Sequence, residues 1–215
     1  VLTWQQLRDD SIALATFLKG AGVGSQDRVA AWMPNVPETI VAMIATSILG
    51  ATFTSTSPDF GVAGVLDRFG QVKPTVLIAA DGYVYANRRH TRLDRLSEVV
   101  AGLPSLEAVI VHGELEEEPD LGHVREGNRG LPIVTLDQAV EAGRRAAQGG
   151  FGADPDALYP FDHPLYILYS SGTTGVPKCI VHRAGGLLVK HVVEQQLHCD
   201  IRPGDRVFYF TTCGW

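Results

Sequence analysis

The stretch RVAAWMPNVPETIVAMIATSILGATFTS, residues 28–55, has the pattern of a strand, a helix and a second strand. Residues 28–32 form a short run that is apolar after its first position, which is typical of a buried strand. Pro37 favours the first turn of a helix, and Gly50 favours the end of one. Residues 51–55 then predict the second strand, so the stretch forms one strand-helix-strand unit.

The same alternation continues on both sides of this unit. Upstream, Thr3 and Gln6 form a capping-box pattern before an amphipathic helix over residues 4–19. Downstream, the pattern predicts helices over residues 57–70, 91–101 and 136–147, and strands over residues 75–80, 108–112, 166–169, 179–182 and 206–212. The alternation indicates an α/β fold, layered, with a mainly parallel sheet flanked by helices. Ligands of such sheets bind outside the carboxyl ends of the strands.

Two stretches interrupt the alternation, residues 113–130 and 149–164, and both are expected to be surface loops. The first carries a run of acidic residues between positions 114 and 120. Such a run is more often a solvated face than a cation or partner site, and we interpret it in that way.

The composition excludes several classes of protein. With 45% hydrophobic and 20% charged residues, the chain is neither fibrous nor wholly disordered, and its 215 residues fit one large domain or a domain and a part. The net charge of −6 disfavours a sequence-independent nucleic-acid binder and gives no attraction to an anionic membrane. Any phosphate must therefore be held by local groups.

The sequence predicts no membrane insertion. Residues 39–58 carry no charge, but their many hydroxyl side chains fit a helix followed by a strand better than a membrane span. No signal-peptide pattern opens the chain.

Cys179, Cys199 and Cys213 are odd in number and far apart, which predicts neither a disulfide framework nor a zinc knuckle. A reducing, cytosolic setting is expected.

Residues 170–178, SSGTTGVPK, lie between two apolar runs and carry the clearest chemical pattern in the chain. Glycine permits positive φ and close approach, successive backbone N–H groups can cradle an anion, and Lys178 adds a full positive charge. A polyphosphate is the expected ligand. Only two residues separate Gly172 from Gly175, and Cys179 follows the lysine, so this is not the P-loop of ATPases. The alternative interpretation is a plain Ser/Gly-rich hairpin turn.

Residues 170–178 resemble the phosphate-binding signature of the adenylate-forming enzymes, the superfamily of acyl-CoA synthetases, peptide-synthetase adenylation domains and luciferases. The resemblance covers nearly the whole chain, including residues 2–4, 22–30, 34–38 and 50–51. Within the superfamily, the branch that activates acetoacetate is the most similar over residues 166–171, 179–182, 197–200, 203–206 and 208–215. Cys179, which stands where most of the superfamily carries glycine, points to the same branch.

The resemblance implies a two-step ligation that uses ATP, Mg²⁺ and CoA. Acetoacetate attacks the α-phosphate of ATP, pyrophosphate leaves, and the CoA thiol then displaces AMP from the acyl-adenylate. By the resemblance, Lys178 is the catalytic residue, because positive charge must balance the departing pyrophosphate. The residues expected to bind the phosphates are Thr173, Thr174, Gly175 and Lys178, while Ser170, Ser171 and Gly172 shape the loop.

Two further site residues follow from the resemblance. Arg88 matches the position where acetyl-CoA synthetases hold the nucleotide of CoA, although Tyr85 stands where a further arginine is expected. Trp215 matches an aromatic residue beside the acyl pocket, where a wide apolar wall would select a short acyl group. The alternatives are a solvated surface arginine and a core tryptophan.

His191, Glu194 and His198 share one helical face at a spacing that can ligate zinc, but we interpret the spacing as coincidental and predict no bound metal. The resemblance also implies that residues 1–215 are part of a large N-terminal adenylate-forming domain, with the ribose-binding, hinge and small-domain motifs beyond Trp215. Two other functions remain open: a ligase for acetate or propionate, and a nucleotide-binding module without turnover.

Overall fold

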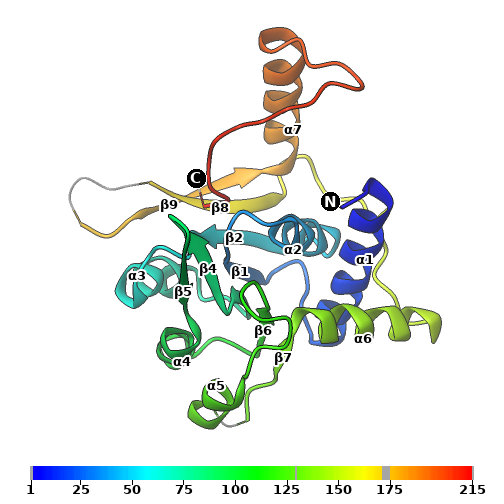
Figure 1. Cartoon of the computed structure of the whole chain (residues 1–215). Helices are drawn as coiled ribbons and strands as arrows, with labels where there is room; N and C mark the ends of the chain where they lie inside the picture. The colour runs from blue at the N-terminus through cyan, green and yellow to red at the C-terminus, as the bar shows by residue number, and fades with distance from the viewer. Residues whose placement is uncertain (1, 129, 171–174, 215) are drawn as a thin grey trace.

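In the computed structural model, which describes residues 2–128, 130–170 and 175–214, seven strands form one sheet in the order β7-β6-β3-β1-β2-β8-β9 (Figure 1). The strands of this sheet are β1 (Arg28–Trp32), β2 (Thr52–Thr56), β3 (Val76–Ala80), β6 (Ala108–His112), β7 (Ile133–Thr135), β8 (Pro164–Ser170) and β9 (Lys178–Arg183). All neighbours are parallel except β8 and β9, which are antiparallel. The prediction of an α/β fold with a mainly parallel sheet is confirmed.

The order of the strands indicates the edge of the sheet at which a ligand is expected to bind. From β1 the chain passes to β2 on one side and then crosses to β3 on the other side of β1. The carboxyl ends of β1 and β3 therefore flank a topological switch point, which is the usual ligand crevice of open α/β sheets.

Helices cover both faces of the sheet (Figure 1). One layer consists of α1 (Trp4–Gly20), α2 (Pro37–Ile48) and α6 (Leu136–Gln148), and the other of α3 (Val62–Val72), α4 (Leu93–Ala101) and α5 (Gly122–Gly127). Alternate residues of β1 enter the two cores: Val29 and Ala31 pack with the first layer, whereas Ala30 and Trp32 pack with the second. This period of two is the geometry of a strand buried on both faces.

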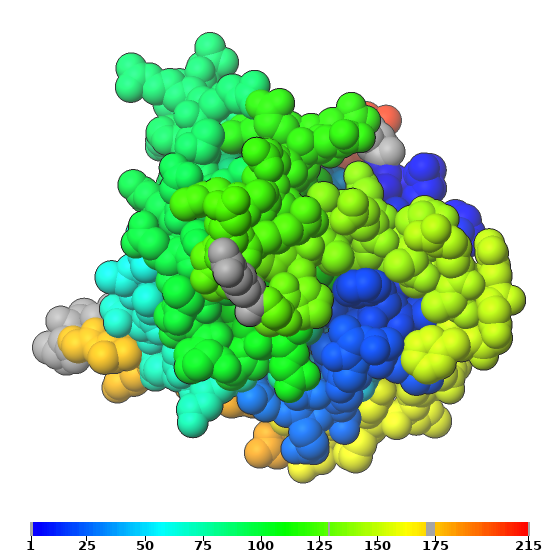
Figure 2. Space-filling view, turned by 90° about the horizontal axis from the view of Figure 1, so that it is seen from below, coloured from blue at the N-terminus to red at the C-terminus, as the bar shows by residue number. Residues whose placement is uncertain are grey.

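The close packing of α1 and α6 requires glycine at position 143. A Cβ atom on Gly143 would lie 1.9 Å from the Ala13 carbonyl oxygen, so the two helices approach closely there. Figure 2 shows the blue end of α1 and the yellow-green α6 in contact, and Arg144 of α6 pairs with Asp10 of α1. Thr3 and Gln6 form the predicted capping box, and Thr135 and Gln138 form a second one.

Several short elements differ from the sequence prediction. The segment 113–130, predicted to be a loop, contains α5, and the short strand β7 was not predicted. An antiparallel hairpin of β4 (Gly82–Tyr85) and β5 (Arg88–Thr91) also went unpredicted. Its turn places Ala86 and Asn87 at φ 48° and 60°, and asparagine tolerates this left-handed region. These elements have three to six residues each, which is too short for a clear periodicity.

Residues 164–214, which we name the C-terminal arm, continue from the sheet through β8 and β9 into α7 (Ala184–Val192) and the π-helical turn η1 (Val193–His198). In Figure 1, α7 projects away from the layered body. The predicted strand over residues 206–212 is wrong, because that segment is irregular. Its apolar side chains are exposed, with Phe208 at 87% and Phe210 at 92%.

The uncharged stretch of residues 39–58 forms most of α2 and all of β2, as predicted. Among the described residues, no helix combines the length and the apolar character that a membrane crossing requires.

Candidate functional site

The predicted phosphate loop connects two antiparallel strands at the carboxyl edge of the sheet. Ser170 at the end of β8 pairs with Lys178 at the start of β9. Because β8 runs parallel to β2, the loop leaves the same edge at which β1, β2 and β3 end. Gly175 has φ 105°, a conformation that favours glycine. Ser171, Gly172, Thr173 and Thr174 lie outside the described residues.

The base of the loop contacts α3 and β2. The Gln71 carboxamide donates a hydrogen bond of 2.9 Å to the Pro177 carbonyl oxygen, and Figure 2 shows the orange start of β9 beside the cyan α3. The hydroxyl groups of Thr54 and Tyr169 form a hydrogen bond of 2.9 Å. Burial raises the pKa of the Tyr169 phenol above its ordinary value, so the phenol stays neutral. Both ends of the loop are therefore fixed to the layered body.

Lys178 is exposed at the start of β9. Its neighbour Cys179 is also exposed. Partial burial raises the pKa of the Cys179 thiol, so the thiol is protonated at neutral pH. The described end of the loop thus carries one positive charge beside a neutral thiol.

Arg88 lies on the β4–β5 hairpin, which follows β3 at the same edge of the sheet. Its neighbour Arg89 pairs with Glu116 and donates to the Leu115 carbonyl oxygen at 2.7 Å. Arg88 is exposed, and its guanidinium has no hydrogen-bond or ion-pair partner among the described residues. The structure therefore distinguishes the two arginines: Arg89 holds the hairpin to the loop after β6, and Arg88 is free for a ligand.

Arg92 is a residue that the sequence interpretation missed. Its guanidinium is buried, and it donates to the Pro58 carbonyl oxygen and to the Tyr83 phenol oxygen, each at 2.9 Å. These bonds fix the hairpin against the connection between β2 and α3. A buried arginine between a hairpin and a helix has no distinctive local sequence pattern, so only the fold reveals this role.

Trp215 lies outside the described residues, but the residues before it are placed. The segment 211–214 lies at the ends of β1 and β2, where a Cβ atom on Gly214 would be 3.0 Å from the Thr56 Cα atom. The structure therefore brings residue 214 to the same edge of the sheet as the loop and the hairpin.

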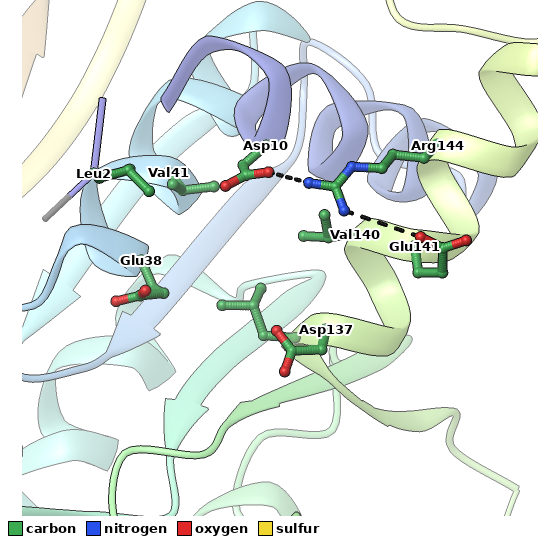
Figure 3. Close-up of a pocket in the computed structure, with 9 residues that line it drawn as sticks. Leu2, Asp10, Glu38, Val41, Asp137, Val140, Glu141 and Arg144 are labelled. Atoms are coloured by element: carbon green, nitrogen blue, oxygen red, sulfur yellow. Dashed lines mark hydrogen bonds and ion pairs between the residues drawn. The ribbon is translucent and has the colours of Figure 1, made fainter. Parts of the chain in front are cut away.

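A hollow of about 310 Å³ lies between α1, α2 and α6 (Figure 3). Its apolar floor is surrounded by the carboxylates of Asp10, Glu38, Asp137 and Glu141 and by the guanidinium of Arg144. Arg144 is paired with Asp10 and lies 4.0 Å from Glu141. The lining is thus net negative and repels ATP, CoA and carboxylic acids.

Of the three residues with zinc-like spacing, Glu194 is engaged by its neighbours. Glu194 bonds to Lys190, and the Glu194 carboxylate lies 3.6 Å from the His198 Nδ1 atom. Lys190 lowers the pKa of the Glu194 carboxyl through this hydrogen bond. In the part of the chain that the structure describes, no three histidine, cysteine or acidic side chains are grouped so as to hold a metal ion.

Comparison with known proteins gives matches over the whole chain. A family model described as "AMP-binding enzyme" matches residues 1–215. The chain is 46% identical over 216 residues to an acetoacetyl-coenzyme A synthetase of Rhizobium meliloti (strain 1021), covering 100% of the chain and 31% of that protein. It is 40% identical over 217 residues to the malonamoyl-CoA synthetase vrtB of Penicillium aethiopicum, covering 100% of the chain and 29% of that protein.

A solved structure described as acetoacetyl-CoA synthetase from Streptomyces lividans superposes with a TM-score of 0.85 at 42% identity. The superposition covers 100% of this chain and 30% of that one. The chain therefore spans about a third of the length of the relatives that it matches.

Proposed function

The chain belongs to the AMP-binding enzyme family, and on that basis we propose that it supplies the phosphate site of a ligase that joins acetoacetate to CoA. We place residues 1–215 in the large N-terminal adenylate-forming domain of such a ligase. The acetoacetyl-CoA synthetases among the relatives support acetoacetate as the acid substrate. We also place the reaction in the reducing cytosol, since Cys179, Cys199 and Cys213 are free thiols.

The observation that supports the proposal is the position of the two ends of the loop, Ser170 and Lys178, at the carboxyl edge of the sheet. Lys178 presents an exposed ammonium group there, and Gly175 has the left-handed conformation that allows backbone N–H groups to converge on an anion. We assign Thr173, Thr174, Gly175 and Lys178 to the β- and γ-phosphates of ATP. We assign Ser170, Ser171 and Gly172 to the shape of the loop.

In the first step, a carboxylate oxygen of acetoacetate attacks the α-phosphorus of ATP, and the bond to the bridging oxygen of the β-phosphate breaks. Pyrophosphate leaves with that oxygen. Lys178 balances the charge that develops on the departing group, together with the Mg²⁺ ion that enters as part of the MgATP substrate. The attacking carboxylate is already a nucleophile, so no protein side chain has to be activated for the attack.

In the second step, the CoA thiol releases its proton to solvent and attacks the acyl carbon, and AMP leaves as the bond between that carbon and the phosphate oxygen breaks. The exposed guanidinium of Arg88 is assigned to the phosphates of CoA. The hydrogen bonds of Arg92 fix the hairpin that carries Arg88, and they thereby fix the backbone from which the Arg88 guanidinium extends. Trp215 is assigned to the wall of the acyl pocket.

The test is the substitution Lys178→Ala in the full-length protein. We expect the single-turnover rate of acyl-adenylate formation to fall by about 100- to 1,000-fold, because a charge contact that matters most in the transition state is lost. Acid binding should change much less. Lys178→Arg should restore the rate only in part, since a planar guanidinium replaces a compact ammonium group.

The matched control is Lys190→Ala, which removes an exposed lysine of the C-terminal arm that pairs with Glu194. Its adenylation rate should equal that of the wild type. An adenylation rate of Lys178→Ala within twofold of the wild type would overturn the assignment of Lys178.

A further inference from the structure

Three hydrogen bonds from the ends of β1 and β2 hold the segment 211–214. The Asn35 Oδ1 atom accepts the Cys213 backbone N–H at 2.7 Å, and the Asn35 Nδ2 atom donates to the Thr211 carbonyl oxygen. The Ser55 hydroxyl, which is buried in β2, donates to the Cys213 carbonyl oxygen. These partners are more than 150 residues apart in the sequence, so the contacts belong to the tertiary fold.

A carboxamide is suited to this position because it offers a donor and an acceptor side by side. Asn35 bonds to the N–H of one residue and to the carbonyl oxygen two positions earlier, as a neighbouring strand would. The segment itself belongs to no strand in the described part of the chain. Among the described residues, the backbone groups of Thr211 and Cys213 have no neighbouring strand to bond to, and the Asn35 carboxamide makes these hydrogen bonds instead.

Asn35 is itself held in place by the connection between β1 and α2. The Pro34 carbonyl oxygen accepts the Thr39 hydroxyl at 2.7 Å and the Val36 N–H at 3.0 Å. Pro34 and Pro37 restrict the backbone on both sides of Asn35. The carboxamide therefore extends from a stiff turn at the switch point of the sheet.

The held segment is also packed closely. Cys213 is half-buried, and burial raises the pKa of its thiol. A Cβ atom on Gly214 would lie 3.0 Å from Thr56 Cα and 3.1 Å from the Ser57 backbone nitrogen, so only a residue without a side chain fits against the end of β2 without a shift. The next residue in the sequence is Trp215.

From these contacts we propose that Asn35, together with Ser55, is a positioning residue that fixes the segment 211–214 and thereby determines which acid the ligase accepts. The inference rests on the proposed function, in which Trp215 forms a wall of the acyl pocket. Asn35 touches no reacting atom. It acts through the backbone that leads into the pocket.

The first experiment measures the position of the segment without reference to activity. The labelling rate of the Cys213 thiol by a thiol reagent is followed by mass spectrometry of the peptide that contains it, in the full-length protein. Asn35→Ala should raise this rate about tenfold, the change expected when two hydrogen bonds are lost. Asn35→Asp keeps the acceptor but not the donor, and should give an intermediate rate. Ser55→Ala should also raise it.

The second experiment measures substrate selection with the same proteins. Asn35→Ala should raise the KM for acetoacetate about tenfold and reduce the preference for acetoacetate over acetate, while the KM for ATP stays within twofold. The matched control is Asn128→Ala, which removes a carboxamide that bonds to the Val124 carbonyl oxygen at the end of α5. It should change neither the labelling rate nor the KM for acid.

Cys213 labelling in Asn35→Ala within twofold of the wild type would overturn the positioning role. Faster labelling with unchanged selection among acids would overturn the link to the acyl pocket. A wild-type protein that forms no adenylate would overturn the proposed function and the selection role together. The labelling rates would still decide whether Asn35 holds the segment.

Discussion

The layered body and the C-terminal arm differ in how deeply their side chains are buried. Every residue of β2 and β3 is buried, and so are four of the five residues of β1. In the arm, Ile167 is the one buried residue of the described strands β8 and β9, and α7 buries none. The proposed catalytic lysine lies in the arm, whereas the groups that position the site lie in the body. The buried strands of the body thus provide most of the stability, and the proposed chemistry belongs to the exposed strands of the arm.

The difference has a physical consequence for the arm. A segment with few buried contacts opens at a lower free-energy cost than the core does. The arm, where the structure describes it, is therefore expected to open more readily than the two cores. Its attachment depends on a small set of bonds to the body, including Thr54 to the Ile167 carbonyl oxygen at 2.9 Å and Gln71 to the Pro177 carbonyl oxygen at 2.9 Å.

The largest expected effect is on stability, and it should separate the two regions. Ile110 in β6 is fully buried, and Ile110→Ala should lower the free energy of unfolding by about 2–5 kcal/mol through lost burial and the cavity that remains. Val181 in β9 is 52% exposed, and Val181→Ala should change stability by about 0.5 kcal/mol or less. Urea unfolding of both variants measures the contrast, and equal losses would remove the distinction between body and arm.

A smaller effect, on the KM for CoA, is expected from a substitution in the β4–β5 hairpin. Arg88→Ala should raise the KM for CoA about fivefold to tenfold, as the loss of a charged hydrogen bond in an exposed position does. The ATP–pyrophosphate exchange rate should stay near the wild-type value, because CoA enters only after the adenylate has formed. The effect should weaken at high salt, where exposed charges are screened.

Arg89→Ala is the matched control, since Arg89 is already engaged with Glu116 and the Leu115 carbonyl oxygen. It should have less effect on the KM for CoA than Arg88→Ala. If Arg88→Ala lowered exchange and thioester formation together, Arg88 would be a structural residue, and the comparison between the two arginines would fail.

The body was predicted from the sequence more accurately than the rest of the chain. The strands around residues 28–32, 75–80 and 108–112 have apolar runs of a length that suits a sheet covered on both faces, so local pattern was sufficient there. The segment 206–212 has the same apolar character but forms no strand. A strand needs a partner for its backbone N–H and carbonyl groups, and hydrophobicity alone does not supply one.

The candidate site was predicted only in part. The SSGTTGVPK pattern indicated the loop because the relevant residues are adjacent in sequence. Asn35, Gln71 and Arg92 were not predicted as site residues, because each acts through a contact with a distant segment. The resemblance singled out Arg88, and the structure adds that its neighbour Arg89 is paired with Glu116.

The most direct test of the central claim is ATP–pyrophosphate exchange by the full-length protein with acetoacetate, acetate and propionate as separate acids. Radiolabelled pyrophosphate enters ATP only if an acyl-adenylate forms reversibly, so the assay reports the first chemical step alone. We predict exchange that depends on the acid and is fastest with acetoacetate. Faster exchange with acetate or propionate would contradict the assigned substrate. Nucleotide binding without exchange for any acid would contradict adenylate formation itself.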